Sequence, residues 1–130
     1  MTEVTADGTK VLVRSEDAAD LANLDPSTAL RLLPAFDPYT LSIQKEAEPL
    51  LPLARRPLVS RAAGWISQVV IVGGAVVATW THEVKKDRLV VGVTPWRRLT
   101  KVERAAIDGE AARIGAFLGA APDVTIGEPA

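Results

Sequence analysis

The chain has 130 residues, a formal net charge of −1 and no cysteine, and its length fits one domain with a real core. The lack of cysteine excludes disulfides, thiolate zinc sites and cysteine nucleophiles. His82 is the one histidine, so a histidine-based metal centre or nucleophile pair would have to use it. The polar, acidic N-terminus is unlike a signal peptide. We expect a cytoplasmic protein with no cofactor and no metal.

The apolar run at residues 65–80 is the segment that most resembles a membrane span, because it begins and ends with tryptophan. It is shorter than the ~20 residues that cross a bilayer as a helix. It also contains Ser67 and Gln68, and Gly73-Gly74 lies at its centre. Valine-rich runs on both sides of a glycine pair are typical of two strands and a turn. The run therefore predicts a hairpin and no membrane contact.

The N-terminal third predicts short elements. Residues 3–14 form an expected hairpin around Asp7-Gly8, which is a two-residue turn signal. Ser15 is placed to cap a short helix over about residues 16–23. Residues 29–33 are an apolar strand, and the proline-containing stretch 40–56 is expected to be a loop with at most one helical turn.

The centre predicts two consecutive hairpins. A turn at Gly73-Gly74 pairs Val72 with Ala75 and Val70 with Val77, and a turn at Lys86-Asp87 pairs His82 with Val91. Side chains alternate across a strand, which divides the residues between two faces. The face expected in the core holds Trp65, Val69, Ile71, Val76, Ala78, Trp80, His82, Leu89, Val91 and Val93.

The C-terminal part predicts a helix over about residues 100–118. Thr100 and Glu103 form a capping box, and Gly119 follows the last helical residue. The buried stripe of this helix is expected to hold Ile107, Ala111, Ile114 and Leu118, which recur at helical spacing. We expect Ile114 in one core with Trp65, Trp80 and Val91. The tail at 123–130 is expected to be frayed. The fold class is α+β: one domain, residues 1–130, with a bent antiparallel sheet or partial β-barrel and the C-terminal helix packed on it.

Charge is distributed unevenly along the chain. Residues 1–54 hold four basic and nine acidic side chains, residues 55–101 hold nine basic and two acidic, and residues 102–130 hold two basic and five acidic. A basic centre between acidic flanks is compatible with a polyanion-facing surface. It is equally compatible with an ordinary solvated surface, because a sequence segment is not a spatial patch.

Few side chains suggest catalysis. We expect His82 to be a buried, hydrogen-bonded histidine, because nothing in the sequence places beside it the carboxylate and open cleft that a general base needs. We expect Asp37 to form an Asx-type turn with nearby backbone N–H groups, and it has no partner carboxylate at a glycosidase-like spacing. Gly73-Gly74 and Gly64 match no phosphate-binding loop.

Basic residues gather at the second predicted hairpin and directly after it. Lys85, Lys86 and Arg88 lie at its tip, and Arg97 and Arg98 follow Trp96. Such residues suit electrostatic contact with DNA phosphates. The alternative is that these charges protect a strand edge and keep the protein soluble.

Four stretches in order carry a family resemblance: LLPAFDPY at 32–39, GWISQVVIVGGAVVATW at 64–80, the Lys/Arg-rich hairpin, and EAARIGAFLG at 110–119. Together they resemble the C-terminal part of the bacterial winged helix DNA-binding domain-containing proteins, a family that includes the DNA glycosylases that unhook interstrand crosslinks. The resemblance covers about residues 9–119. The sequence departs from the family at Gln68, where proline is frequent, at Gly73, where the hairpin is often Asp-Gly, and at Ala78, where glycine is frequent.

The resemblance implies a C-terminal, β-barrel-like module that follows tandem winged helices. The glycosylases carry a catalytic Gln-x-Gln or Gln-x-Asp motif in that preceding part, and here only Gln44-Lys45-Glu46 matches it superficially, in an unrelated proline-rich context. It therefore implies a module of a DNA-repair protein without catalytic residues and without activity as an isolated chain. Its implied partners are duplex DNA, bound weakly and salt-dependently through Lys85, Lys86, Arg88, Arg97 and Arg98, and winged-helix domains.

The alternative function is a protein-interaction or scaffold domain with no nucleic-acid role. An enzyme acting on small molecules has the least support, because no polar side chains are predicted to converge.

Overall fold

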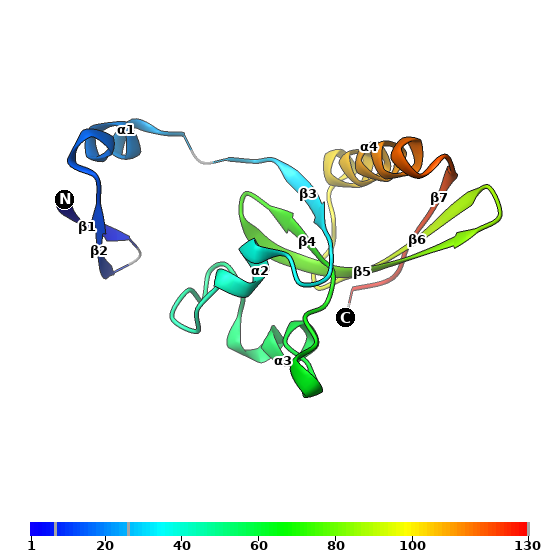
Figure 1. Ribbon diagram of the computed structural model, residues 1–130, viewed down its shortest axis with the longest axis horizontal. Helices are drawn as coiled ribbons and strands as arrows, with labels where there is room; N and C mark the ends of the chain where they lie inside the picture. The colour runs from blue at the N-terminus through cyan, green and yellow to red at the C-terminus, as the bar shows by residue number, and fades with distance from the viewer. Residues whose placement is uncertain (7, 26, 130) are drawn as a thin grey trace.

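The computed structural model describes residues 1–6, 8–25 and 27–129, and its centre is a five-stranded sheet in the order β3-β4-β5-β6-β7 (Figure 1). Strands β3 to β6 pair antiparallel, and β7 pairs parallel with β6. The expected α+β class is confirmed, but the sheet stays open and does not close into a barrel. Its strands are β3 (Leu30–Leu33), β4 (Val69–Val72), β5 (Ala75–Lys85), β6 (Arg88–Pro95) and β7 (Ala121–Ile126).

Helix α4 (Lys101–Leu118) packs on one face of the sheet, as predicted. Its N-terminus is held by the expected capping box: the Thr100 hydroxyl accepts from the Glu103 N–H at 3.1 Å, and the Glu103 carboxylate accepts from the Thr100 N–H at 2.9 Å. Gly119 ends the helix in the left-handed conformation, with φ 70°. That conformation favours glycine, so both ends of α4 follow from local sequence.

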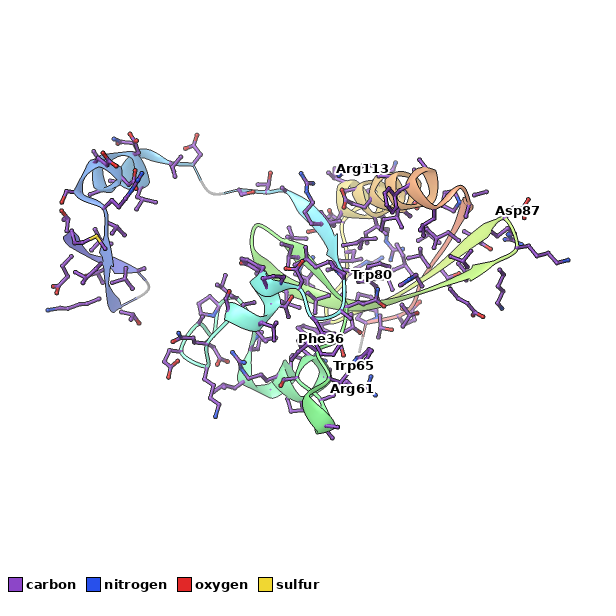
Figure 2. The ribbon with its side chains drawn as sticks, viewed as in Figure 1. Phe36, Arg61, Trp65, Trp80, Asp87 and Arg113 are labelled. Carbon is purple, nitrogen blue, oxygen red and sulfur yellow. The ribbon has the colours of Figure 1, made fainter. Side chains whose placement is uncertain are left out.

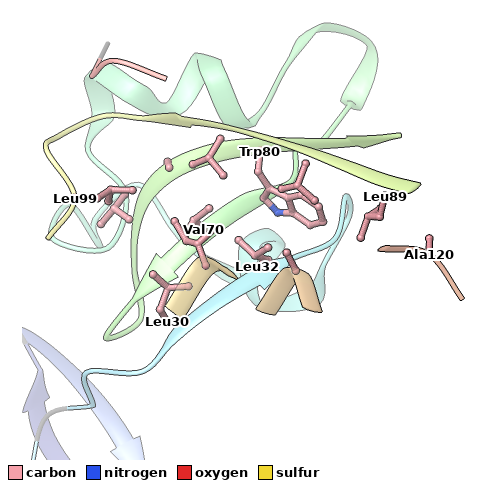
Figure 3. Packing of buried hydrophobic residues seen from close by; sticks show 13 residues of the cluster. Leu30, Leu32, Val70, Trp80, Leu89, Leu99 and Ala120 are labelled. Carbon is pink, nitrogen blue, oxygen red and sulfur yellow. The ribbon is translucent and has the colours of Figure 1, made fainter. Parts of the chain in front are cut away.

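The core between α4 and the sheet is organised around Trp80 (Figure 3). The Trp80 ring is 5% exposed, and its indole N–H donates to the Leu33 carbonyl at 2.9 Å. Val91 is fully buried in the same core, and Ile114 packs against it from α4. The prediction that Trp80, Val91 and Ile114 share one core is confirmed, as are Ile107 and Ala111 of the predicted helix stripe. Leu118 of that stripe is 45% exposed, so its predicted burial is wrong.

A β-bulge interrupts the pairing of β4 with β5. Val72 pairs with Ala75 as predicted, but Val70 pairs with Ala78, which leaves Val77 without a direct partner. A bulged residue reverses the alternation of side chains beyond it. The predicted core face is therefore wrong, because it mixes residues of two faces: the Trp80 core includes Val70, Val77 and Ala78, and the opposite face carries Val69, Ile71 and Val76.

The long connection from β3 to β4 covers that opposite face. It contains more helix than predicted: α2 (Pro38–Ser42), η2 (Leu53–Arg55), α3 (Arg56–Val59) and η3 (Ala62–Gly64). Ile43, Leu51 and Val59 pack from this connection onto the sheet and form a second core. The sheet is thus covered on both faces.

Trp65 lies outside both cores and is 48% exposed, so its prediction as a core residue is wrong. The alternation assumed for β4 does not reach it, because β4 begins only at Val69. Ala63 and Gly64 both have positive φ (63° and 75°), and this turn sets the direction of the Trp65 side chain independently of the sheet.

The N-terminal segment is a separate hairpin and helix: β1 (Thr2–Ala6), β2 (Thr9–Val13), η1 (Ser15–Asp17) and α1 (Ala18–Asn23). The predicted hairpin and helix are confirmed, and Asp7 of the turn lies outside the described residues. The Ser15 cap is wrong, because the Ser15 hydroxyl accepts a hydrogen bond from the Thr2 hydroxyl and caps nothing. None of the described residues before Leu30 is buried, and Figure 1 shows this segment standing apart from the sheet.

The prediction of fraying from Asp123 is wrong for residues 123–127, which continue as a paired strand and one further hydrogen bond. Strand β7 pairs with β6 over its whole length, and beyond it the Gly127 N–H donates to the Val93 carbonyl at 2.9 Å. The two strands are separated in the sequence by the whole of α4, so no pattern of neighbouring residues predicts that they pair. Pro122 is tolerated because β7 is an edge strand.

The apolar run at 65–80 contains β4 and the first part of β5, and no part of it is helical. Within the described ranges, no helix combines the length and apolar character needed to cross a membrane.

Candidate nucleic-acid interface

The hairpin tip (residues 85–88) joins β5 to β6 and carries three of the predicted DNA-binding residues. The predicted register is confirmed, with His82 opposite Val91 and Val84 opposite Leu89. Lys86 takes a positive φ of 57° in the turn. Lys85, Lys86 and Arg88 are all exposed. Figure 1 shows the hairpin extending beyond the end of α4, and Figure 2 labels Asp87 at its extremity.

Acidic side chains match the three cations of the hairpin tip in number: Asp87 lies within the tip, and Glu83 and Asp123 lie beside it. Lys85 lies 3.7 Å from Glu83, and Arg88 forms an ion pair with Asp123 of β7. Lys86 forms no ion pair among the described residues. Ion pairs between exposed side chains contribute little and exchange readily with other partners. The tip therefore offers cations that can turn toward an external anion.

Arg97 has a structural role that the sequence did not predict. Its guanidinium donates two hydrogen bonds of 2.8 Å to the two carboxylate oxygens of Glu103. This fork lowers the pKa of Glu103 to about 2 and raises the pKa of Arg97, chiefly through the hydrogen bonds between the two side chains. Arg97 thus fixes the loop before α4, and Arg98 beside it is exposed with no ion pair among the described residues.

The five predicted DNA-binding residues do not form one patch. The hairpin tip lies at the start of β6, whose first residue is Arg88, whereas Arg97 and Arg98 follow the other end of the strand. Seven residue steps along a strand span roughly 23 Å. A contiguous surface that uses all five would have to follow the full length of β6.

His82 is exposed, which contradicts the expected buried histidine. Its Nδ1 lies 2.9 Å from the Gln68 amide nitrogen, and its ring centroid lies 5.5 Å from that of Trp80. In the part of the chain that the structure describes, no carboxylate is hydrogen-bonded to the ring. This arrangement lacks the partner that a general base requires.

Asp37 has the turn role that the sequence predicts. It is the N-cap of α2, and its carboxylate accepts from the Tyr39 N–H at 2.9 Å. The Tyr39 hydroxyl donates to the Gly74 carbonyl at 2.5 Å, which ties this turn to the β4–β5 turn. Gly73 and Gly74 both have positive φ, as expected of turn glycines. Both motifs are structural.

An exposed aromatic pair is a feature that the sequence analysis missed. Phe36 and Trp65 are 46% and 48% exposed, and their rings meet edge to face with centroids 5.0 Å apart. Figure 2 shows Arg61 near them, on the opposite side of the sheet from α4. The sequence did contain one indication of this exposure: Gly64 directly before Trp65 favours a turn at the position where we predicted a continuous strand.

No cluster of three or more His, Cys, Asp or Glu side chains within residues 1–6, 8–25 and 27–129 could hold a metal ion.

Comparison with known proteins identifies the relatives of this chain. Residues 1–117 match the family model described as DNA glycosylase AlkZ-like. The chain is 40% identical over 119 residues to an interstrand DNA cross-link repair glycosylase from Streptomyces sahachiroi, covering 92% of this chain and 31% of that relative. Its fold matches the solved structure of Streptomyces sahachiroi DNA glycosylase AlkZ with a TM-score of 0.79 and 39% identity, covering 97% of this chain and 33% of that one.

These matches confirm the predicted relation to crosslink-repair glycosylases. They do not support the winged-helix family name that the sequence suggested. The chain spans about a third of the length of the relatives that it matches. With nine tenths of its residues inside the family match and its fold reproduced in a solved relative, the chain belongs to the AlkZ-like DNA glycosylase family.

Proposed function

We propose that this chain is a DNA-contacting, non-catalytic module of a crosslink-repair glycosylase, and that its hairpin tip meets the phosphate backbone. The observation that carries the proposal is the projection of three exposed cations at the end of the β5–β6 hairpin. Phosphate contacts need mobile, solvent-accessible cations and no base-specific geometry. Arg98 is an additional candidate, and the bond from Arg97 to Glu103 makes Arg97 the weakest of the five.

We expect the catalytic residues of the crosslink-repair glycosylase to lie outside this module. The geometry around His82 and Asp37 supplies no paired acid and base. We expect winged-helix domains, in the same or a separate chain, to supply the catalytic residues, and the cytoplasm to be the site of action. The isolated 130-residue chain should release no base from alkylated or crosslinked DNA in a glycosylase assay. Release that persists after purification and disappears in Asp37→Asn or His82→Ala would contradict this assignment.

Salt-dependent DNA binding tests the role of the hairpin tip. We expect the wild type to bind a labelled duplex weakly, and neutralisation of Lys85, Lys86 and Arg88 to glutamine to weaken that binding. The slope of log K against log salt should flatten by about 0.9 for each phosphate that the protein no longer neutralises. Fluorescence anisotropy at several salt concentrations measures both effects. A Lys85→Gln, Lys86→Gln double variant separates phosphate binding from any loosening of β7 that follows removal of the Arg88–Asp123 pair.

A matched triple variant on α4 controls for net charge. Lys101, Arg104 and Arg113 are exposed, and their change to glutamine removes the same three charges elsewhere. This variant should keep most of the wild-type affinity and slope. Equal losses in the two triple variants would mean that only overall charge matters, and an absence of wild-type binding at low salt would reject the proposal.

The second candidate is a protein-interaction module, which the exposed apolar residues of α4 favour. Phe117 is 88% exposed and Leu118 beside it is 45% exposed, while Val102, at the other end of the helix, is 79% exposed. Neighbouring apolar side chains that remain in water are typical of contact surfaces. This candidate becomes the first choice if the duplex titration shows no binding.

A further inference from the structure

We propose that the depression beside Trp65 binds an unpaired nucleotide, with the base stacked on the indole and a phosphate held by Arg61. The inference rests on the proposed DNA role of the chain, but concerns a different surface from the hairpin tip. The depression has a volume of about 430 Å³ and is lined by, among others, Leu58, Arg61, Trp65, Gln68, Thr79 and Thr81. Its volume falls within the range of small-ligand pockets.

The aromatic pair is the first argument. Trp65 and Phe36 pack edge to face, with an interplanar angle of 77°, yet each keeps nearly half of its surface in water. Two cores lie within the same fold, so an indole directed outward is not explained by a shortage of buried space. A rigid, half-exposed indole is the usual platform on which single-stranded bases stack.

The backbone that presents these rings is the second argument. Phe36 and Ala63 are non-glycine residues in the left-handed region, with φ of 60° and 63°. Such conformations are uncommon and are held in place by surrounding structure, and they concentrate at ligand sites. Here the Phe36 N–H donates to the Ile66 carbonyl at 3.3 Å, and the Arg61 N–H donates to the Trp65 carbonyl at 2.8 Å. These bonds fix the loop that carries Trp65.

The charge and polarity of the depression are the third argument. Among the described residues that line it, Arg61 is the one that carries a charge, and none is acidic. Between residues 49 and 82 the chain has three arginines and no carboxylate. Gln68, Thr79 and Thr81 add neutral donors and acceptors around the indole. An aromatic plane, a guanidinium and neutral polar groups are complementary to a base and its phosphate.

The ligand must be unpaired. In an intact duplex each base is stacked on its neighbours, so its face is not available to a side chain. The depression therefore predicts a preference for single-stranded or extrahelical nucleotides, whereas the hairpin tip contacts any backbone.

The test compares a single strand with a duplex of equal length. The probe is a labelled oligothymidylate of roughly 12 nucleotides, a length within known single-strand site sizes, and the comparison is a blunt duplex. Trp65→Ala should weaken oligothymidylate binding at least about fivefold, given the contribution of one stacked base, and should leave duplex binding within twofold. Trp65→Phe should retain most of the affinity and also keeps an aromatic ring against Phe36.

Tryptophan emission gives a direct second readout. The oligothymidylate should quench the wild-type emission, and most of the quenching should be lost in Trp65→Phe, because Trp80, which also lines the depression, is only 5% exposed and Trp96 lies outside it. Phe117→Ala is the matched control, since it removes an exposed aromatic ring from α4. Arg61→Gln should weaken oligothymidylate binding and flatten its salt slope.

The inference is overturned if Trp65→Ala binds the oligothymidylate as well as the wild type does, or if Phe117→Ala loses as much affinity as Trp65→Ala. It is also overturned if a proline-rich peptide quenches the Trp65 emission and the oligothymidylate does not, because the depression would then be a peptide site. If duplex binding depends on the hairpin tip while Trp65→Ala has no effect, this inference alone fails. If Trp65 governs single-strand binding while the tip variants bind duplex normally, the proposed role of the tip fails and this inference stands.

Discussion

Two glycines of α4 should respond in opposite ways to the same substitution. A methyl group added at Gly109 would meet no atom within 4 Å, whereas one added at Gly115 would lie 2.4 Å from the Ala120 carbonyl oxygen and 3.4 Å from the Pro122 ring. Alanine is favoured over glycine inside a helix by about 0.8–1.0 kcal/mol. Gly109→Ala should therefore raise the free energy of unfolding by about 1 kcal/mol.

At Gly115 the gain in helix propensity competes with a backbone clash. The Ala120 oxygen belongs to the connection that leads into β7, and the neighbouring Ala120 N–H donates to the Gly115 carbonyl at 2.8 Å. That connection cannot move without displacing α4 from β7. Overpacking costs about 1–3 kcal/mol, and a 2.4 Å approach to a backbone atom places Gly115→Ala in the upper part of that range, at about 2–3 kcal/mol. After the propensity gain is subtracted, Gly115→Ala should lower the free energy of unfolding by about 1–2 kcal/mol.

Urea unfolding followed by far-ultraviolet circular dichroism measures both variants. The two free energies should differ by about 2–3 kcal/mol, which for a chain of this size corresponds to roughly 6–15 °C between their melting temperatures. If Gly115→Ala is stabilised as much as Gly109→Ala, then α4 does not approach the start of β7 as closely as the structure shows, and the reasoning fails.

Two further predictions concern the core and the start of α4. Trp80→Ala should lower the free energy of unfolding by about 3–5 kcal/mol, because it empties a buried site and leaves the Leu33 carbonyl without its donor; a loss below about 1 kcal/mol in urea unfolding would contradict its burial. Because the pKa of Glu103 is lowered from 4.5 to about 2, its bond to Arg97 stabilises the fold fully above the higher value and is lost as the pH falls through the lower one. Arg97 is 45% exposed, so solvent screening limits the contribution of this ion pair to about 1 kcal/mol. In a pH series of urea unfolding, the difference in stability between the wild type and Glu103→Gln should vanish near the lower pKa. A difference that persists at that pH would contradict this role for the carboxylate.

Features encoded by neighbouring residues were predictable from the sequence. The capping box of α4, the stop at Gly119, the turn at Lys86-Asp87 and the Asx turn at Asp37 each depend on contacts within a few residues. Local hydrogen bonds and φ preferences decide these positions, so distant parts of the chain do not alter them.

Features that depend on distant residues were not predictable. Val77 is an extra residue in β5 that has no partner in β4, and it shifts which side chains of the two strands share a face. A run of valines gives no signal for the position of such a bulge. Strand β7 pairs with β6 across the whole of α4. The exposure of Trp65 follows from the turn at Ala63 and Gly64, and the spread of the basic residues follows from the length of β6.

The coverage of the sheet on both faces ends abruptly along β5. Up to Trp80 the strand lies between two cores, but every residue from 81 to 88 is exposed. Backbone amides in the covered part should exchange with deuterium only through large openings, whereas those of β5 beyond Trp80 should exchange through local fraying. Beyond Trp80, β5 is thus a compliant edge on a rigid base, because β6 beside it stays paired with β7 and keeps Leu89 and Val91 buried. This edge can adjust to an uneven surface while the β6–β7 pairing behind it stays intact.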